Sequence, residues 1–327
     1  MYKQADTIPI QGKFGISITG RSRKIDVKRV SIRRVNIGIE IKQDPTCDTL
    51  TWYGNWVMDS VTVDSCEIVG TGNQALYIGN TSPDNPLYSP RPITCNSVVI
   101  YPQPFRLGSI TVKNCYIDST GRSGIQISTS SEGMNYVYNN IVKHNGLNGD
   151  EAQPNAILIG SYTSAEISYN TISNTLTYGV GSIGGSNTDS ALYIHHNTID
   201  SSGYLRFFDN SVTSNQYYKQ NTATTFTDTF NYARNIHLQT VPQSFNDSAG
   251  FRIQYNSFGI KKSANNINLF DAYNKMHKAP GKNCISNNTL IAGGSVTVSV
   301  EGANQVYYSE CLAAIRYRIR YKFKRNN

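Results

Sequence analysis

The chain has 327 residues and a formal net charge of +8. Six of its 30 Lys and Arg residues fall in the last dozen positions, between Arg316 and Arg325, and without them 24 basic residues stand against 22 acidic ones. A nucleic-acid-binding face requires basic residues spread over its surface, so this distribution argues against a nucleic-acid partner. No apolar run has the length of a membrane-spanning helix.

One spacing recurs eight times along the chain. An apolar residue is followed by residues two, five and seven positions later, and steps of two are strand steps whose side chains share one face. The step of three inserts one residue, which bends the chain at a corner. The copies begin at Ile25, Val61, Ile110, Met134, Ala165, Leu192, Phe251 and Asn283.

The third position of each copy is the predicted corner. It holds Val30, then Cys66 and Cys115, and asparagine in the last five copies, beginning with Asn139 in Met134-Tyr136-Asn139-Ile141. Asparagine tolerates the left-handed backbone of a one-residue corner, and stacked asparagine side chains can hydrogen-bond to one another. We therefore expect one residue per copy to stack inside the molecule.

A second short strand with a small residue at its head follows most copies. These strands are predicted at residues 15–18, 38–41, 75–78, 124–127, 156–159 and 179–182, with weaker copies at 204–207, 266–269 and 295–298. Each unit thus supplies three strands and cannot bury its apolar face alone, so the units must stack. The fold class is all-β, a parallel solenoid of about eight to nine coils.

The repeat carries a family resemblance. Runs such as Ile167-Ser-Tyr-Asn-Thr-Ile172 and Ile194-His-His-Asn-Thr-Ile199, each followed by a strand that begins with glycine and an apolar residue, resemble repeats of the pectin-lyase-like superfamily. Over residues 14–300 this resemblance implies a single-stranded right-handed parallel β-helix and an extracellular or cell-surface location. The superfamily holds polysaccharide lyases, glycosidases, epimerases, phage tailspikes and non-catalytic modules, so it specifies a fold more than a chemistry.

We expect one β-helix domain over residues 1–310, with its N-terminal cap and any leader absent. Loop insertions are predicted near 43–56, 80–108 and 208–248. The last of these contains either a lid or one irregular extra coil around Asn235-Ile-His-Leu238. Within residues 311–327, apolar and basic side chains alternate from Ile315 to Lys324, which predicts a C-terminal strand or cap over the open end of the solenoid. The alternative is a membrane or polyanion anchor.

The six cysteines form no spacing suited to a metal, and no metal site is predicted. Cys66 and Cys115 occupy the same corner of successive coils, about 4.8 Å apart. That distance permits a disulfide, but packing as small apolar thiols is favoured. Cys47 and Cys95 fall in the long loops.

In the superfamily, ligands lie along the face of the second strand. The outward residues of that strand, one per coil, are Ser17, Glu40, Tyr77, Gln126, Leu158, Gly181, Arg206, Asn268 and Thr297. Tyr77 and Gln126 are the predicted substrate contacts. Glycoside hydrolysis needs two carboxyl groups about 5 to 10 Å apart, and the row offers only Glu40, with Asp44 in the next loop.

Lyases and epimerases need a base that removes a proton and a cation that stabilises the resulting anion. The cation is either a basic side chain or Ca²⁺, which is the one metal ion considered as a cofactor. Arg122, His144, Asp150 and Glu151 come from loops of consecutive coils and are the catalytic candidates together with Glu40. The alternative for the two loop acids is a solvated turn, and for His144 a turn residue.

Aromatic residues mark two further places. Trp52, Tyr53 and Trp56 in the 43–56 loop either stack on sugar rings or fasten the loop to the helix. His195-His196 precedes a corner Asn; the equivalent positions are assigned to Ser65, Asn114, Tyr138, Tyr169 and Tyr255, which favours stacking over metal binding.

These observations predict a carbohydrate-active β-helix that acts on or binds an extended polysaccharide, as a lyase, hydrolase or epimerase. The alternatives are a non-catalytic carbohydrate-binding or surface module and a phage tailspike-like segment. The oligomeric state stays open.

Overall fold

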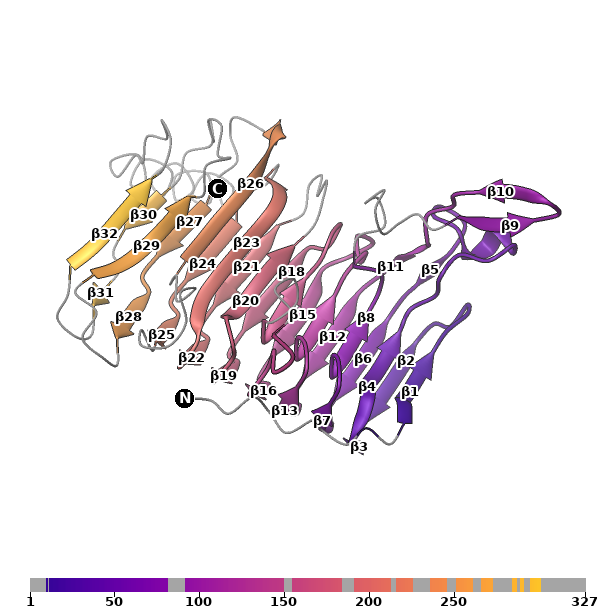
Figure 1. The fold of residues 1–327 in the computed structure, drawn as a ribbon, viewed down its shortest axis with the longest axis horizontal. Helices are drawn as coiled ribbons and strands as arrows, with labels where there is room; N and C mark the ends of the chain where they lie inside the picture. The colour runs from indigo at the N-terminus through magenta and orange to yellow at the C-terminus, as the bar shows by residue number, and fades with distance from the viewer. Residues whose placement is uncertain are drawn as a thin grey trace, which may run out of the picture.

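A computed structural model describes residue 10 and residues 12–81, 92–149, 155–183, 191–212, 216–225, 236–245, 251–260, 266–272, 284–286, 289–290 and 295–300. These residues form a parallel β-helix, as predicted, and Figure 1 shows its strands stacked along one axis. The predicted C-terminal strand or cap over 311–327 lies outside the described residues. Among the residues that are described, no helix is long and apolar enough to cross a membrane.

Sheet A holds ten strands and contains the small-headed strands of the sequence pattern. In spatial order they are β1 (Gly12–Ile18), β4 (Val35–Ile41), β8 (Leu76–Ile78), β14 (Ile125–Ile127), β17 (Ile157–Ile159), β20 (Tyr178–Ile183), β23 (Gly203–Val212), β26 (Ile236–Phe245), β29 (Asn266–Ala272) and β32 (Ser295–Val300).

Sheets B and C hold nine strands each and contain the two halves of the eightfold repeat. Sheet B consists of β2 (Ile25–Lys28), β6 (Val61–Asp64), β12 (Ile110–Lys113), β15 (Asn135–Tyr138), β18 (Ala165–Ser168), β21 (Leu192–His195), β24 (Gln216–Lys219), β27 (Phe251–Gln254) and β30 (Cys284–Ser286). Sheet C consists of β3 (Ser31–Arg33), β7 (Glu67–Thr71), β13 (Tyr116–Thr120), β16 (Ile141–Lys143), β19 (Thr171–Ser173), β22 (Thr198–Asp200), β25 (Thr222–Thr225), β28 (Ser257–Ile260) and β31 (Thr289–Leu290).

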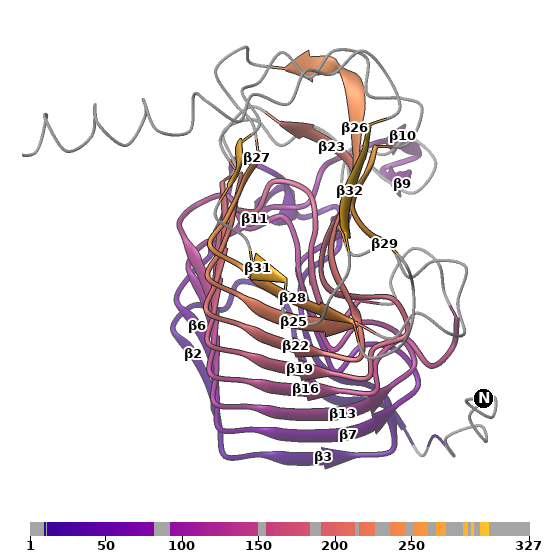
Figure 2. The same ribbon diagram turned by 90° about the vertical axis from the view of Figure 1, so that its left-hand side faces the viewer.

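In cross-section the three sheets enclose one core. Figure 2 shows sheets A and B as opposite walls and sheet C as the floor between them. The core is a stack of aliphatic side chains, such as Ile39, Val63 and Ile117, that are fully buried. Cys66 and Cys115 are buried free thiols within this stack, which agrees with packing as small apolar groups.

The predicted register of the fourth copy is wrong by one residue. Asn135 and Val137 pair with Ala165 and Ile167, so the inward corner is Asn140 and not Asn139. Asn140 is 1% exposed, whereas Tyr136 and Ile141, predicted inward, are 39% and 40% exposed. Because side chains alternate along a strand, a slip of one residue exchanges the two faces completely.

The left-handed residue of each corner also differs from the prediction. It is the residue before the inward corner position, with φ between 54° and 57°; these residues are Arg29, Ser65, Asn114, Asn139, Tyr169, His196, Gln220 and Tyr255. In the last five of these corners the next residue is an asparagine that is buried and hydrogen-bonded along the axis. Backbone N and Nδ2 of Asn140 both donate to Oδ1 of Asn170, at 3.0 and 2.9 Å. The same pair of bonds joins Asn170 to Asn197, Asn197 to Asn221, and Asn221 to Asn256.

The segment near 208–248, predicted to contain either a lid or one irregular extra coil, contributes a further coil made of β24, β25 and β26, in agreement with the second alternative. Its corner is Asn221, which the eightfold repeat did not include. The polar sequence Thr222–Thr225 makes this coil hard to detect from hydrophobic periodicity, because Ala223 is the one apolar residue of that stretch.

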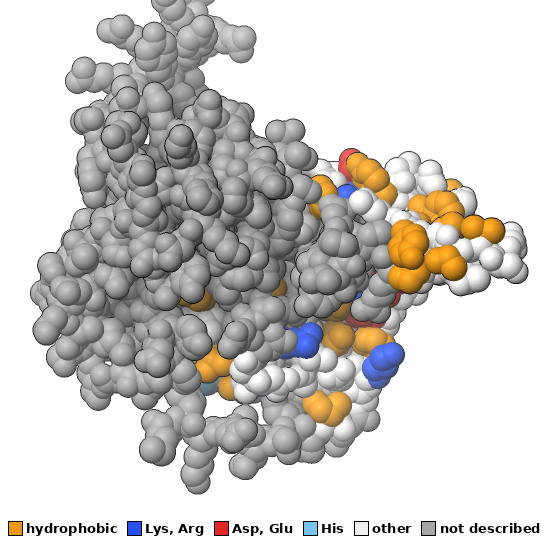
Figure 3. Space-filling model, turned by 45° about the horizontal axis from the view of Figure 1, so that its top comes forward, with side chains coloured by type: hydrophobic (Ala, Val, Ile, Leu, Met, Phe, Trp, Pro, Cys, Tyr) orange, Lys and Arg blue, Asp and Glu red, His pale blue; other side chains and the backbone are white. Residues whose placement is uncertain are grey.

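Two insertions leave the solenoid near its N-terminal end. One holds the short helix η1 (Thr49–Thr51) and β5 (Val57–Met58), and the other holds the hairpin of β9 (Ile93–Cys95) and β10 (Val98–Ile100) and the strand β11 (Arg106–Leu107). A disulfide between Cys47 and Cys95 and the pairing of β11 with β5 tie them together. The hairpin projects from the solenoid in Figure 1, and exposed apolar side chains gather on this projection in Figure 3.

Candidate functional site

The predicted outward row is continuous on sheet A. The register places Ser17 beside Glu40, Glu40 beside Tyr77, and Tyr77 beside Gln126, each on the next rung. Neighbouring rungs of a sheet are about 4.8 Å apart, so this row can follow an extended ligand along the axis.

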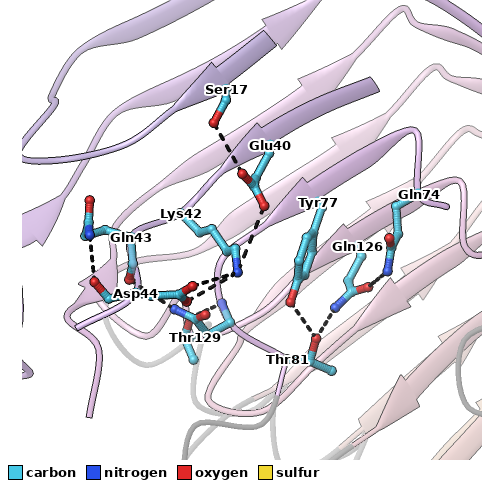
Figure 4. A network of polar contacts seen from close by, with 11 residues as sticks. Ser17, Glu40, Lys42, Gln43, Asp44, Gln74, Tyr77, Thr81, Gln126 and Thr129 are labelled. Carbon is cyan, nitrogen blue, oxygen red and sulfur yellow. Dashed lines mark hydrogen bonds and ion pairs between the residues drawn. The ribbon is translucent and has the colours of Figure 1, made fainter. Parts of the chain in front are cut away.

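At the N-terminal end of the row, a lysine organises two carboxylates and a tyrosine ring. The ammonium of Lys42 lies 4.0 Å from Glu40 Oε1 and 3.2 Å from Asp44 Oδ1, and 5.1 Å from the centre of the Tyr77 ring. Ser17 donates to the second Glu40 oxygen at 3.2 Å. Figure 4 shows these five residues, which we call the lysine cluster.

The lysine cluster follows from local geometry. Glu40 is the last outward residue of β4, and Lys42 continues the strand by donating its backbone N–H to Ile18. Residues 40, 42 and 44 are two apart and therefore share a face. The Glu40 carboxylate is 10% exposed and the Lys42 side chain 17%, so each charge compensates the desolvation of the other. Sequence reasoning did not single out Lys42, although the Glu-x-Lys-x-Asp alternation was available as a signal.

Gln126, predicted as a substrate contact, is fully buried. Its Oε1 accepts from Gln74 at 2.9 Å and its Nε2 donates to Oγ1 of Thr81 at 2.5 Å. Thr81 also contacts the Tyr77 hydroxyl at 3.3 Å, and Figure 4 shows it between the two side chains. Gln126 is therefore corrected from a substrate contact to a buried structural residue. Thr81, which follows β8, lies over the row at this rung, and both ends of the Gln126 amide are hydrogen-bonded.

Arg122 and His144 come from adjacent turns, but the imidazole of His144 is directed to sheet C. The backbone N–H of Gly146 donates to the Arg122 carbonyl at 3.0 Å, which places the turns side by side. His144 has φ 49° and its Nδ1 lies 2.8 Å from Asp118 Oδ1 on the outer face of β13. The ring of His144, a predicted catalytic candidate, is therefore held at the floor sheet and not on the sheet A face where the ligand was expected. Asp150 and Glu151 lie outside the described residues.

The two tryptophans fasten the insertion to the solenoid. Trp52 donates its indole N–H to the Thr46 carbonyl at 2.7 Å and bridges to Pro104, while Trp56 packs on the core with the Arg23 guanidinium 4.0 Å from its ring. These contacts favour the fastening role over sugar stacking. Tyr53 differs from both, since it is 54% exposed.

Tyr53 belongs to a stack that sequence reasoning missed. The guanidinium of Arg106, itself 3% exposed, lies between the Tyr53 ring at 4.5 Å and the Tyr162 ring at 3.9 Å. Ser161, which precedes Tyr162, donates its N–H to the Thr81 carbonyl at 3.4 Å, so the stack adjoins the end of the sheet A row. No local pattern signals it, because the three residues are about fifty positions apart in sequence.

The model of the family described as the right handed beta helix region matches residues 14–199, more than half of the chain. This chain belongs to the right-handed β-helix family. The crystal structure of alginate lyase from Paenibacillus sp. str. FPU-7 is similar at 14% identity, with 89% of each chain covered and a TM-score of 0.40. No curated protein matches the chain.

The β-helix protein carries its histidine pair on sheet B, where ring contacts dominate. The His196 ring stacks on Tyr169, with centroids 5.0 Å apart and planes 16° apart, as the sequence favoured. Tyr138 is not part of this corner, because the corrected register puts Asn139 there. Within the described part of the chain, no group of three or more His, Cys, Asp or Glu side chains could hold a metal ion.

The Asp118 carboxylate gives the β-helix protein an acid-sensitive contact. Burial acts to raise the pKa of Asp118, but hydrogen bonds from His144, Tyr116 and Ser119 outweigh it and hold the pKa below its ordinary value. A depressed carboxyl pKa contributes stability above the unfolded value near 3.9, and this contribution is lost as the pH falls through the folded pKa. We expect Asp118→Asn to lower the free energy of unfolding at pH 7 by about 1 to 2 kcal/mol.

The difference between Asp118→Asn and the parent should shrink below pH 4, as measured by urea unfolding from pH 7 to 2.5. Asp26→Asn is the matched control. The Asp26 side chain is 59% exposed and forms an ion pair with Lys28 at the surface, so its loss should cost less than about 0.5 kcal/mol at any pH. A constant difference for Asp118→Asn across the range would contradict the assignment.

Proposed function

We propose that this β-helix protein binds an extended polysaccharide along the outer face of sheet A, at the lysine cluster. One observation carries the proposal: at one end of the sheet A row the Lys42 ammonium contacts the carboxylates of Glu40 and Asp44 and approaches the Tyr77 ring, and the Ser17 hydroxyl donates to Glu40. Charged hydrogen-bonding groups match sugar hydroxyls, and the tyrosine ring offers an apolar face to a pyranose ring.

A non-catalytic binding role is favoured over lyase or epimerase chemistry. The imidazole that was expected to act as a base is held by Asp118 on the outer face of sheet C. The Arg106 guanidinium is 3% exposed and enclosed by two tyrosine rings, which leaves it poorly placed to stabilise an anion on a substrate. The family match to the β-helix supports a carbohydrate-active protein only at the level of the fold.

Glycoside hydrolysis is the second candidate, because Glu40 and Asp44 contact the same ammonium group. Two carboxylates that contact one ammonium group can adopt the spacing that these enzymes use, about 5 to 9.5 Å. In that case Lys42 would keep both carboxylates in place, and one of them would have to take up a proton to act as general acid.

The Cys47–Cys95 disulfide supports a location outside the cell or at its surface, since disulfides persist in oxidising compartments. A polysaccharide is the partner that fits this location and the sheet A row.

The test is a panel of soluble neutral and uronic polysaccharides, measured by affinity electrophoresis, with parallel assays for unsaturated products and new reducing ends. We expect Tyr77→Ala to weaken binding at least tenfold, about 1.4 kcal/mol. Tyr101→Ala is the control, because Tyr101 is 62% exposed on the segment after the projecting hairpin. Reducing ends that disappear in Glu40→Gln would establish hydrolysis, and a parent protein that binds no member of the panel would overturn the proposal.

A further inference from the structure

The outer face of sheet B carries an aromatic column that the sheet A proposal does not use. Tyr136, Glu166 and Tyr193 are direct partners in register on three consecutive rungs. Tyr136 is 39% exposed, Tyr193 is 37% exposed and the Glu166 side chain is 38% exposed. Two rungs separate the tyrosines by about 9.5 Å, the length of a disaccharide unit in an extended glycan.

Aromatic side chains at this outward position are not needed to form sheet B. The same outward position holds Thr62 and Thr111 in the two preceding coils, which build the same sheet without aromatic side chains. Single exposed tyrosines are common on protein surfaces, but a row of them on one sheet face is a feature of interaction sites.

Polar groups between the tyrosines are fixed in orientation. His195 Nε2 lies 3.3 Å from Glu166 Oε1, and His195 Nδ1 lies 2.8 Å from His196 Nδ1. A neutral His195 that donates its Nε2–H to Glu166 can accept a hydrogen bond at Nδ1 from the Nδ1–H of His196. The Nε2 atom of His196 is then an acceptor. Burial lowers the pKa of His195 against the opposing influence of Glu166, which agrees with the neutral ring. Tyr169 holds the His196 ring by stacking.

The chemistry of the column favours a neutral sugar over the other ligand classes. Tyrosine rings with hydroxyl tips alternate with a carboxylate and imidazoles, so the surface is flat and amphipathic, like a pyranose ring with its hydroxyl rim. A uronate or another polyanion would meet the Glu166 carboxylate, which lies in register between the two tyrosines. An apolar protein partner would find charged and hydrogen-bonding groups between the rings.

We propose that the outer face of sheet B between Tyr136 and Tyr193, with Glu166 and His195, is a second carbohydrate-binding site that takes a neutral β-linked polysaccharide lying along the solenoid axis. Sheets A and B are opposite walls of the solenoid, as Figure 2 shows, so one glycan segment cannot occupy both sites. The second site is therefore independent of the lysine cluster and allows one protein to hold two chains or two stretches of one chain.

The test uses hydroxyethyl cellulose, xylan and galactomannan as neutral probes and polygalacturonate as the acidic probe, in affinity electrophoresis and calorimetry. We expect Tyr136→Ala with Tyr193→Ala to weaken binding of at least one neutral polymer tenfold or more, while polygalacturonate binding is unchanged. Tyr255→Ala is the matched control, since Tyr255 is 48% exposed on a later corner outside the column. Tyr77→Ala in sheet A should leave this binding intact, which separates the two proposals.

Variants with tryptophan in place of the two tyrosines distinguish a loss of binding from a folding defect. Tyr136→Trp with Tyr193→Trp keeps the flat rings and should bind the neutral polymer at least as well as the parent, with an unchanged thermal midpoint. The proposal is overturned if the parent binds no neutral probe or if the alanine pair binds as tightly as the parent. It is likewise overturned if light scattering shows a dimer that the alanine pair converts to monomer, because the face would then be an interface between copies of the chain.

Discussion

Replacement of Asn140 by alanine is expected to lower the free energy of unfolding by about 3 to 5 kcal/mol. Asn140 Oδ1 accepts the backbone N–H of Cys115 at 3.0 Å, and its Nδ2 donates to the Val112 carbonyl and to Asn170 Oδ1. All of these groups are in the solenoid interior, where an unpaired donor or acceptor keeps its full desolvation cost. Urea unfolding followed by circular dichroism measures the loss.

The neighbouring residue provides the control. Asn139 is exposed and has φ 57°, a backbone that glycine adopts freely, so Asn139→Gly should change the free energy of unfolding by less than about 0.5 kcal/mol. Together, Asn140→Ala and Asn139→Gly distinguish the register of β15 in which Asn140 is the interior residue from the one in which Asn139 is. A large loss for Asn139→Gly with a small one for Asn140→Ala would show that Asn139 is the interior residue.

Gly38→Ala is expected to destabilise the solenoid by about 3 kcal/mol or more. A Cβ atom at Gly38 would lie 2.4 Å from the Ala75 carbonyl oxygen and 2.6 Å from Ile68 Cγ2. The first contact is with backbone in the adjacent strand of sheet A, which cannot move without breaking the ladder that Ile39 makes to Ala75. The physical cause is overpacking at the point where sheet C turns into sheet A.

Gly54→Ala separates this effect from the general cost of replacing glycine. Gly54 has φ +84°, and a Cβ atom added there would meet no other part of the molecule within 4 Å. Alanine should therefore cost only the left-handed backbone penalty, about 1 to 2 kcal/mol. Thermal and urea unfolding of both variants provide the comparison. Equal losses for the two variants would contradict the packing argument.

The strand positions could be read from local patterns because each depends on side-chain alternation within a few residues. Ala75 and Gly124 stand directly before β8 and β14 as expected, whereas Gly38 lies inside β4, which begins at Val35. The close approach of neighbouring backbone at Gly38 and Gly124 explains why small residues are needed there. The coil that contains Asn221 was ambiguous in sequence because Thr222–Thr225 presents almost no apolar side chain.

The site residues were harder to predict than the strands. Tyr77 and Glu40 lie on the predicted face, since their orientation follows from strand register alone. His144 and Gln126 do not play the predicted roles, because their surroundings depend on Asp118 and Thr81, which other turns bring to them. The backbone angle of a turn and the identity of the residue that covers a row of side chains both result from packing. A short stretch of sequence does not reveal either of them.

The stack of three-stranded coils follows from local properties of the sequence, namely the period of two along a strand and the single-residue corner. The choice between Asn139 and Asn140 as the interior residue depends on tertiary structure, because Val137 pairs with Val112 and Ile167 in the adjacent strands, and this pairing selects between two registers one residue apart. Tertiary structure likewise places the Tyr77 ring beside Lys42, and it aligns Tyr136, Glu166 and Tyr193 on the opposite wall. Both arrangements arise from the stacking of coils about thirty residues or more apart in the chain.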